Sequence, residues 1–358
     1  MFRFRNDYSQ GAHPRVLEAV AACSPEGNDG YGADPHCARA AALIRELCAA
    51  PDAAVHFFVG GTAANLTAIA AFLRPWECVL CPDTGHINVH EGGAAEAAGH
   101  KIMGLPTSDG KLRPHDLEPV LERCRDTAMV LPRMVYISDA TEVGTVYSRM
   151  ELAALSAFCR AHGLLLFLDG ARLGTALTCG NCESCGNCES CGDCESCGDC
   201  GLTLPDLAVL TDAFYIGGTK NGALMGEAMV LANPTIQPHF FRAMKQRGSV
   251  LAKGFLLGAQ FEALLEDGLY WDLARHANAM ARRLRAGLEK KGVEFLVNSP
   301  TNQLFPIFPK AQLPRLEELC SFEKWEDVDG TRTAVRFVTS FATTEGEVDG
   351  LLNSMRNS

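Results

Sequence analysis

Residues 164–170 read Leu-Leu-Leu-Phe-Leu-Asp-Gly, and residues 214–220 read Phe-Tyr-Ile-Gly-Gly-Thr-Lys. Each is a short apolar run of strand length that is closed by glycine, and this pattern favours a fully buried strand. Asp169 therefore stands at the end of one predicted strand and Lys220 just beyond the end of another. A turn aspartate rarely terminates five consecutive apolar residues, so we expect Asp169 to be buried at the strand end.

Similar runs recur on both sides of this pair. We predict seven strands, at 54–59, 78–81, 101–105, 134–138, 164–169, 213–216 and 227–231, with helices between them. One helix is expected to begin at Asp34-Pro35, and another at Ser148, where Glu151 completes a capping box. Strands alternating with helices are typical of an α/β fold with a mostly parallel sheet.

The pattern changes near residue 237. Long helical stretches at 252–265 and 270–291 are followed by short alternating segments, a strand near 334–339 and a last helix from Thr344. We therefore predict a large domain over residues 1–236, and helical linking segments with a small α+β domain over residues 237–358.

The composition narrows the class of protein. The chain has 358 residues, of which 47% are hydrophobic and 21% charged, with a net charge of -11. No run of lysine and arginine offsets the acidic balance, so we expect no nucleic-acid partner. No segment has the apolar core of a signal peptide or the length of a membrane span, so we expect no membrane partner and a cytoplasmic location.

Two further strand ends carry polar residues. Gly60-Gly61-Thr62 follows the first predicted strand and opens a helix, where free amides and a hydroxyl are suited to a phosphate group. A glycine pair in this position is also a common turn. His86 follows the second strand, where its flat ring is either stacked on a flat ligand or simply satisfied in a loop.

Together these features point to one cofactor. A lysine that forms a Schiff base and a carboxylate that keeps a pyridine nitrogen protonated are the groups that pyridoxal phosphate chemistry requires. The phosphate loop, the ring of His86, Asp169 and Lys220 occur in that order along the chain. Arg172 adds a planar donor fork for a carboxylate or phosphate, and Thr219 adds a hydroxyl.

In this order the motifs resemble the fold type I pyridoxal-phosphate enzymes, and among them the threonine aldolase and β-eliminating lyase group. The resemblance covers nearly the whole chain and includes Tyr31-Gly32-Ala33-Asp34-Pro35, His86-Ile87-Asn88 with Glu91-Gly92-Gly93, Asp169-Gly170-Ala171-Arg172, Thr301-Asn302-Gln303-Leu304-Phe305 and Val335-Arg336-Phe337-Val338-Thr339. It implies a three-layer, aspartate-aminotransferase-like large domain around a mostly parallel seven-stranded sheet, with a small C-terminal α+β domain.

The resemblance also implies roles for individual residues. Lys220, His86 and Asp169 would be catalytic. The implied cofactor-binding residues are Gly61, Thr62, His86, Asp169, Arg172, Thr219 and Lys220, and the implied substrate-binding residues are Asn6, Tyr31, Glu142, Arg172 and Arg336. Tyr31 is expected to enter the site of a neighbouring subunit, and Lys253 to face a neighbour's phosphate.

The activity implied is cleavage of a β-hydroxy amino acid, threonine or allo-threonine, to glycine and an aldehyde. The small-molecule substrate would bind to a homo-oligomer, a dimer or a tetramer, whose subunits share sites. The family usually has serine where Asn6 stands, and many members have histidine where Glu142 stands. An acidic Glu142 near the substrate hydroxyl has two interpretations. It serves as a base in the same reaction, or it indicates a β-eliminating lyase or a transaminase on the same scaffold.

The sixteen cysteines fall into two groups of eight. Those outside the repeat are expected to be mostly buried, with Cys78 and Cys81 on opposite faces of one strand. The others recur every third residue in an insertion at residues 179–200: Cys179, Cys182, Cys185, Cys188, Cys191, Cys194, Cys197 and Cys200. A low-complexity expansion without a catalytic role is the preferred interpretation. Metal binding, disulfides within the loop and a metal-buffering or redox-sensing protein with a vestigial site remain alternatives.

Overall fold

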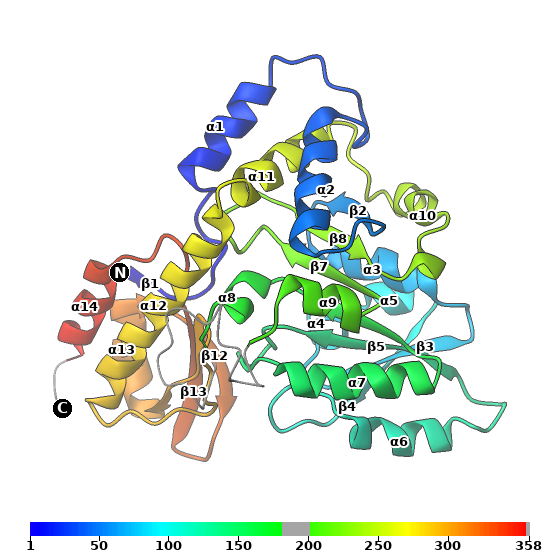
Figure 1. The fold of residues 1–358 in the computed structure, drawn as a ribbon. Helices are drawn as coiled ribbons and strands as arrows, with labels where there is room; N and C mark the ends of the chain where they lie inside the picture. Colours follow the sequence, from blue (N-terminus) through cyan, green and yellow to red (C-terminus); the bar gives the residue numbers. More distant parts are fainter. Residues whose placement is uncertain (181–200, 356–358) are drawn as a thin grey trace.

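A computed structural model describes residues 1–180 and 201–355 (Figure 1). Its main feature is a seven-stranded sheet in the order β2-β8-β7-β6-β5-β3-β4. The strands are β2 (Ala54–Phe58), β3 (Glu77–Pro82), β4 (Lys101–Leu105), β5 (Leu131–Ser138), β6 (Leu165–Asp169), β7 (Ala213–Gly217) and β8 (Glu227–Leu231). All seven predicted strands are present. Only β8 runs antiparallel to its neighbours, so the predicted mostly parallel sheet is confirmed.

Helices cover both faces of this sheet, which gives the predicted three layers (Figure 1). They are α2 (Pro35–Leu47), α3 (Gly61–Phe72), α4 (His86–Val89), α5 (Ala94–Ala97), α6 (Pro114–Arg123), α7 (Arg149–Ala161), α8 (Leu173–Leu177), α9 (Leu204–Leu210) and α10 (Phe240–Gln246). Helix α1 (Pro14–Cys23) packs mainly on the later helix α11 (Phe255–Leu265). The caps predicted for α2 and α7 are formed, because Asp34 accepts a hydrogen bond from the Cys37 amide and Ser148 and Glu151 make a capping box.

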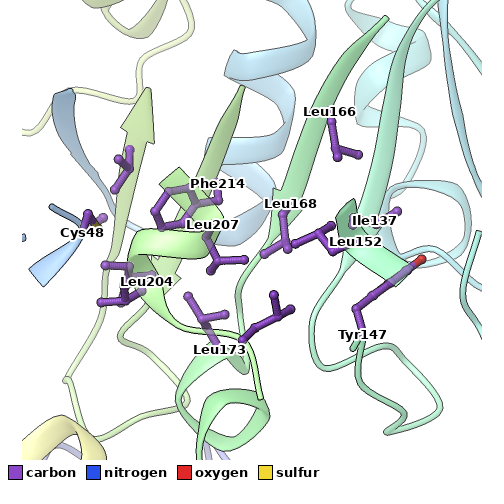
Figure 2. Packing of buried hydrophobic residues seen from close by; sticks show 14 of the residues in the cluster. Cys48, Ile137, Tyr147, Leu152, Leu166, Leu168, Leu173, Leu204, Leu207 and Phe214 are labelled. Carbon is purple, nitrogen blue, oxygen red and sulfur yellow. The ribbon is translucent and has the colours of Figure 1, made fainter. Parts of the chain in front are cut away.

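A separate hydrophobic cluster lies on each face of the sheet. Figure 2 shows part of the first cluster, to which β6 contributes Leu166 and Leu168, β7 contributes Phe214, and α9 contributes Leu204 and Leu207. The second cluster takes the alternate residues of the same strands, such as Phe167 and Tyr215. Strands buried on both faces explain why the sequence shows continuous apolar runs instead of alternation.

The cysteines outside the repeat are all buried, as expected. Cys78 belongs to the first cluster and Cys81 to the second, so the two thiols lie on opposite faces of β3. Of the repeat, only Cys179 lies within the described residues. The other seven cysteines, and the interpretations placed on them, lie outside. In the part of the chain that is described, no group of three or more metal-ligating side chains is suited to hold a metal ion.

Two long helices lead to the C-terminal region, α11 (Phe255–Leu265) and α12 (Leu269–Glu289). The remaining elements are β9 (Gln303–Leu304), β10 (Ile307–Pro309), α13 (Leu313–Leu319), β11 (Cys320–Ser321), β12 (Glu323–Asp327), β13 (Arg332–Val338) and α14 (Glu345–Ser354). They enclose a third hydrophobic cluster, which gives a small α+β unit as the sequence predicts.

The first residues of the chain join this C-terminal unit. Strand β1 (Phe2–Arg3) pairs in parallel with β11, and Phe4 is fully buried in the third cluster. The Phe4 amide donates to the carbonyl of Ser321, and the Val338 amide donates to the carbonyl of Phe4. The next residues then pass from this unit to the edge of the large sheet.

Among the described helices, none combines the length and the apolar character that crossing a bilayer requires.

Candidate active site

The predicted site residues gather at one edge of the large sheet. Strands β2, β3, β5, β6 and β7 all point the same way, so their carboxyl ends meet at this edge. Gly61 follows β2, His86 follows β3, Glu142 follows β5, Asp169 ends β6 and Lys220 follows β7. This juxtaposition brings together residues that are up to 159 positions apart in the chain.

Asp169 is the most deeply held of these groups, with 4% of its surface exposed. Its carboxylate accepts hydrogen bonds from the Tyr136 hydroxyl (2.6 Å), the Asn65 amide (3.1 Å) and the backbone of Ala171 (3.0 Å). Burial alone would raise the pKa of Asp169, but the charge of His86 and the hydrogen bonds of Tyr136 and Tyr215 lower it below its usual value. The residue therefore offers an ionised carboxylate to a cationic ring nitrogen.

His86 is tied to Asp169 through two intermediate side chains. Its Nδ1 lies 2.8 Å from Oε1 of Glu91, which is buried. The Asn65 amide nitrogen donates both to the same Glu91 oxygen (2.8 Å) and to Asp169. A continuous line of hydrogen bonds thus runs from His86 through Glu91 and Asn65 to Asp169, and we call it the Asn65 network.

Lys220 stands on a turn that is fixed to strand β8. The amides of Gly218 and Thr219 donate to the carbonyl of Gly226, and the Gly226 amide donates to the Thr219 hydroxyl (3.0 Å). Gly218 requires the absence of a side chain, since an added Cβ would lie 2.7 Å from that same carbonyl oxygen. The turn is therefore rigid.

The ammonium group of Lys220 is left unengaged. Within the described residues its Nζ makes no hydrogen bond or ion pair, and it lies 6.0 Å from the centroid of the Tyr8 ring. Burial, with the positive charge of Arg172, lowers the pKa of Lys220. A lysine that gives up its proton readily is a better nucleophile, which suits the predicted role.

A buried glutamate, Glu227, lies beside this turn. It accepts a hydrogen bond from the Gly218 amide (3.1 Å), and burial raises its pKa to about 8. The hydroxyl of Thr219 contacts it as well. Thr219, predicted to bind phosphate, therefore already has partners within the protein.

The predicted phosphate loop has the geometry of an anion cradle. Helix α3 begins at Gly61 with no side chain capping its first amides, and the neighbouring Thr62 is exposed. A Cβ on Gly61 would lie 2.8 Å from the hydroxyl of Tyr215, so glycine is needed for close packing. The free amides of a helix of twelve residues are directed to the edge where Lys220 lies.

The two predicted substrate arginines have different surroundings. Arg172 is bound by Asp7 through Nε (2.7 Å) and Nη2 (3.0 Å), so most of its donor fork is occupied. Asp7 is 1% exposed and is also bound by Asn302 (3.0 Å). Arg336 contacts Glu323 through Nη2 and lies over the ring of Trp325.

Asn6 and Glu142 lie near the same edge. The side-chain oxygen of Asn6 accepts hydrogen bonds from the Tyr8 amide and the Ser9 hydroxyl, which leaves its side-chain nitrogen to donate. Glu142 accepts from the Ser138 hydroxyl (2.7 Å) and the His86 amide (2.9 Å). Burial, with the charge of Asp169, raises the pKa of Glu142.

Tyr31 and Lys253 are not brought to this group. Both are exposed, and the ring of Tyr31 lies under the ammonium group of Lys245 (4.0 Å). Tyr31 has a positive φ of 63° and its amide donates to the carbonyl of Ala252 (3.0 Å). The predicted contact of these two residues with a neighbouring subunit stays a prediction.

The side chains present fit pyridoxal phosphate. The polar atoms in the region that are buried without a hydrogen-bond partner among the described residues include Oδ1 of Asn65, Oε2 of Glu142 and Nε of Arg336. The edge further offers a free lysine, an ionised carboxylate and uncapped helix amides, which match an aldehyde, a pyridine nitrogen and a phosphate.

The functional importance of several residues was missed in the sequence. Asn65 follows the predicted phosphate loop Gly60-Gly61-Thr62, and Glu91 stands in Glu91-Gly92-Gly93, but the sequence predicts a role for neither. Tyr136 and Asp7 had no local signal, because each acts through a partner that is distant in the chain, 33 and 165 positions away. Glu227 begins an apolar strand and contacts the turn of Gly218, nine positions earlier, which the sequence pattern does not reveal.

Comparison with known proteins places these findings in a family. A family model described as β-eliminating lyase matches residues 4–310. The low specificity L-threonine aldolase of Pseudomonas sp. (strain NCIMB 10558) is 32% identical over 358 residues, covering 99% of this chain and 97% of that protein. The Escherichia coli K12 protein of the same name is 29% identical over 312 residues, covering 85% and 84%. A solved threonine aldolase of Leishmania major has a TM-score of 0.91 and 45% identity, and the match covers 99% of this chain and 98% of that one.

Proposed function

The chain belongs to the β-eliminating lyase family, and from this membership we propose that it is a pyridoxal-phosphate-dependent lyase that cleaves threonine to glycine and acetaldehyde. The predicted family, fold and carbon-carbon lyase class agree with these matches. The observation that carries the proposal is the Asn65 network beside the free Lys220, since it joins a base to a cofactor-holding carboxylate.

Each residue of the site has a part in this reaction. Lys220 would bind the aldehyde of the cofactor, Asp169 its ring nitrogen, and Gly61 and Thr62 its phosphate, with His86 lying against the ring. When bound, pyridoxal phosphate supplies an electron sink for the pair released from the broken carbon-carbon bond.

His86 is the proposed base for the substrate hydroxyl. With its Nδ1 held by Glu91 at 2.8 Å, the other ring nitrogen, Nε2, is left to take the hydroxyl proton, directly or through a water. Arg336 and the amide nitrogen of Asn6 would hold the substrate carboxylate. Glu142, near the same edge of the sheet, would face the substrate side chain.

A β-eliminating lyase or a transaminase is the alternative that Glu142 favours. Its carboxyl group has an oxygen, Oε2, without a partner among the described residues, and is thus available as an acid or base for another bond. Purified protein is incubated with threonine, and acetaldehyde is measured against pyruvate, ammonia and keto acid. Acetaldehyde with glycine in equal amounts is expected, whereas ammonia or a keto acid would assign one of the alternatives.

The role of Lys220 is tested separately. The protein is expected to be yellow, and borohydride should fix the cofactor on Lys220, as found by peptide mass spectrometry. Lys220→Ala should lose the colour and at least about a thousandfold in activity, while Lys290→Ala, at an exposed helix end, should lose neither. A colourless wild type would contradict the cofactor assignment.

We also propose a cytoplasmic homo-oligomer, a dimer or a tetramer, in which Tyr31 and Lys253 reach a neighbour's site. The exposure of Tyr31 supports the contact between subunits, because an exposed tyrosine with a strained backbone is a candidate for an interface. Light scattering gives the subunit number. Tyr31→Ala is expected to lower activity with cofactor retained, and a monomeric, fully active wild type would contradict the proposal.

A further inference from the structure

The two arginines of the site differ in how firmly each is already neutralised. Arg172 and Asp7 form a two-point ion pair, with side chains 11% and 1% exposed, and Asn302 holds the same carboxylate. A substrate carboxylate cannot displace such a partner without leaving a buried charge unpaired. Arg172 is therefore a fixed part of the site.

Arg336 is bound less completely. Only Nη2 of its guanidinium contacts Glu323, whose side chain is 39% exposed. Its Nε is buried and has no hydrogen-bond partner among the described residues. The guanidinium has unused donors, and its acidic partner has free access to water.

The pairing of Glu323 with Arg336 follows from the sheet. The two residues are directly opposite each other in the antiparallel pair of β12 and β13, so their side chains lie on the same face. Trp325, two residues further along β12, lies beneath the guanidinium at 5.3 Å from the ring centroid. Trp325 keeps Arg336 in place whether or not Glu323 is bound to it.

The charges of this pair interact with residues of the site. Burial and the charge of Arg172 lower the pKa of Arg336, which places the two guanidinium groups within electrostatic reach of each other. The charges of Glu323 and Arg336 also reach His90, whose ring is 5.6 Å from that of His86.

From this contrast, and resting on the proposed function, we propose that Glu323 is a displaceable stand-in for the substrate carboxylate and thereby sets the affinity of the enzyme for amino acids. In the free enzyme Glu323 occupies Arg336. An incoming α-carboxylate takes its place on Nη2 and on the unpartnered Nε, and Glu323 turns to solvent. The apparent affinity is lowered by the fraction of molecules in which Arg336 is occupied.

A strut that holds Arg336 in position is the contrasting role for Glu323, and the two roles predict opposite results. Glu323→Gln removes the competing charge and keeps the size of the side chain. A stand-in predicts tighter substrate binding in this variant, whereas a strut predicts weaker binding because the guanidinium loses its support.

The experiment measures binding and turnover in the full-length holoenzyme. Calorimetric titration with propionate and with glycine is expected to give a Kd about three- to tenfold lower for Glu323→Gln than for wild type. The KM for threonine should fall by the same factor, with kcat unchanged within about twofold, since the competing contact exists only before substrate binds.

Glu294→Gln is the matched control. Glu294 forms an ion pair with Arg332 on the same strand β13 (2.9 Å), away from the site, and its removal should leave every constant unchanged. An unchanged or higher Kd for propionate in Glu323→Gln would overturn the proposal. Binding of propionate needs no turnover. A wild type that fails to cleave threonine would therefore overturn the proposed function, while the Kd values for propionate would still test the role of Glu323.

Discussion

Asn65 is a single neutral side chain between two buried carboxylates. Its amide nitrogen donates to Glu91 at 2.8 Å and to Asp169 at 3.1 Å. Among the described residues, the ring of His86 is the only ion-pair partner within 4.0 Å of either carboxylate, and it contacts Glu91. Hydrogen bonds to buried charged groups contribute about 1.5–3 kcal/mol each. This amide therefore adds one hydrogen bond to the carboxylate of Asp169, beside those of the Tyr136 and Ala171 donors.

We predict that Asn65→Ala weakens binding of pyridoxal phosphate by at least about tenfold. Without the amide the two carboxylates repel each other, the pKa of Asp169 rises and the ring nitrogen loses its counter-charge. Cofactor affinity is measured by dialysis and absorbance.

The control for this variant is Asn233→Ala. Asn233 donates to Asp212 at 2.6 Å, which is the same kind of contact outside the site. It should leave cofactor binding unchanged, and equal losses in both variants would mean that general destabilisation accounts for the effect.

For single residues, the sequence was enough to predict the charged residues and glycines at strand ends, but not the side chains that bind them. Asp169 stands out because it terminates an apolar run, and Lys220 because it follows a glycine turn just beyond another. Asn65 lies inside an alanine-rich helix pattern, where its contacts with residues 26 and 104 positions away leave no local trace.

At the scale of elements, α2 and α11 pack unusually closely. A Cβ on Gly258 of α11 would lie 2.3 Å from the backbone nitrogen of Cys37 and 2.7 Å from its Cα. Backbone atoms on a helix cannot move aside as a flexible side chain does. The absence of a side chain at residue 258 thus sets the distance between the two helices.

Gly258→Ala is expected to destabilise the protein by about 2–3 kcal/mol, because the helices must separate to admit the methyl group. Chemical denaturation measures this loss. Gly346→Ala, in the first turn of α14 where only one atom lies as near as 4.0 Å, should be neutral or slightly stabilising. A Gly258→Ala variant as stable as wild type would show that α2 and α11 separate without loss of free energy of unfolding, and would contradict the prediction.

His36 adds a pH-dependent contact between the same elements. Its Nδ1 lies 2.8 Å from Glu262 of α11 and its Nε2 lies 2.8 Å from Glu26, with Arg39 also on Glu262. Burial alone would lower the pKa of His36, but the two carboxylates outweigh it and raise the pKa. The folded protein therefore binds this proton more tightly than the unfolded chain.

The predicted consequence is a loss of stability with rising pH. The stabilisation is complete below the unfolded pKa of about 6.5 and is lost as the pH rises through the higher folded value. Melting temperatures at pH 6 and pH 9 should differ more for wild type than for His36→Gln. His115→Gln, at an exposed histidine, should behave as wild type, and equal slopes in all three would contradict the prediction.

The elements themselves were predicted well where burial is uniform. All seven strands of the large sheet were predicted. The five inner strands, β3 and β5 to β8, are buried on both faces, which leaves continuous apolar runs, whereas the edge strands β2 and β4 are only partly buried. The orientation of β8 was not predictable, since an apolar run carries no information on strand direction. Strand β1, with two residues and a partner more than 300 positions away, has no signal in the sequence.

At the scale of the whole molecule, Asp7 connects three parts of the protein. It lies in the N-terminal segment, binds Arg172 at the edge of the large sheet, and accepts from Asn302 of the C-terminal unit. Burial alone would raise the pKa of Asp7, but Arg172 and Lys220 hold it below its usual value. The ion pair is therefore present throughout the neutral range.

We predict that Asp7→Asn costs about 3 kcal/mol of stability or more, because it leaves the charge of Arg172 buried and unpaired. The midpoint of urea unfolding reports this loss. Asp267→Asn, which breaks the exposed pair with Arg15, should have little effect. Similar midpoints for wild type and Asp7→Asn would show that Arg172 finds another partner.

The pairing of the first residues with the C-terminal unit also bears on how the protein is made. Residues 2–7 leave the ribosome long before their partners Asn302, Ser321 and Val338 are synthesised. A nascent chain can form the large sheet early, but Asp7, the counter-charge of Arg172, is not held by Asn302 until the C-terminal unit has been synthesised. Completion of the site is thus a late event in biosynthesis, and a polypeptide released before residue 302 has a sheet without a working centre.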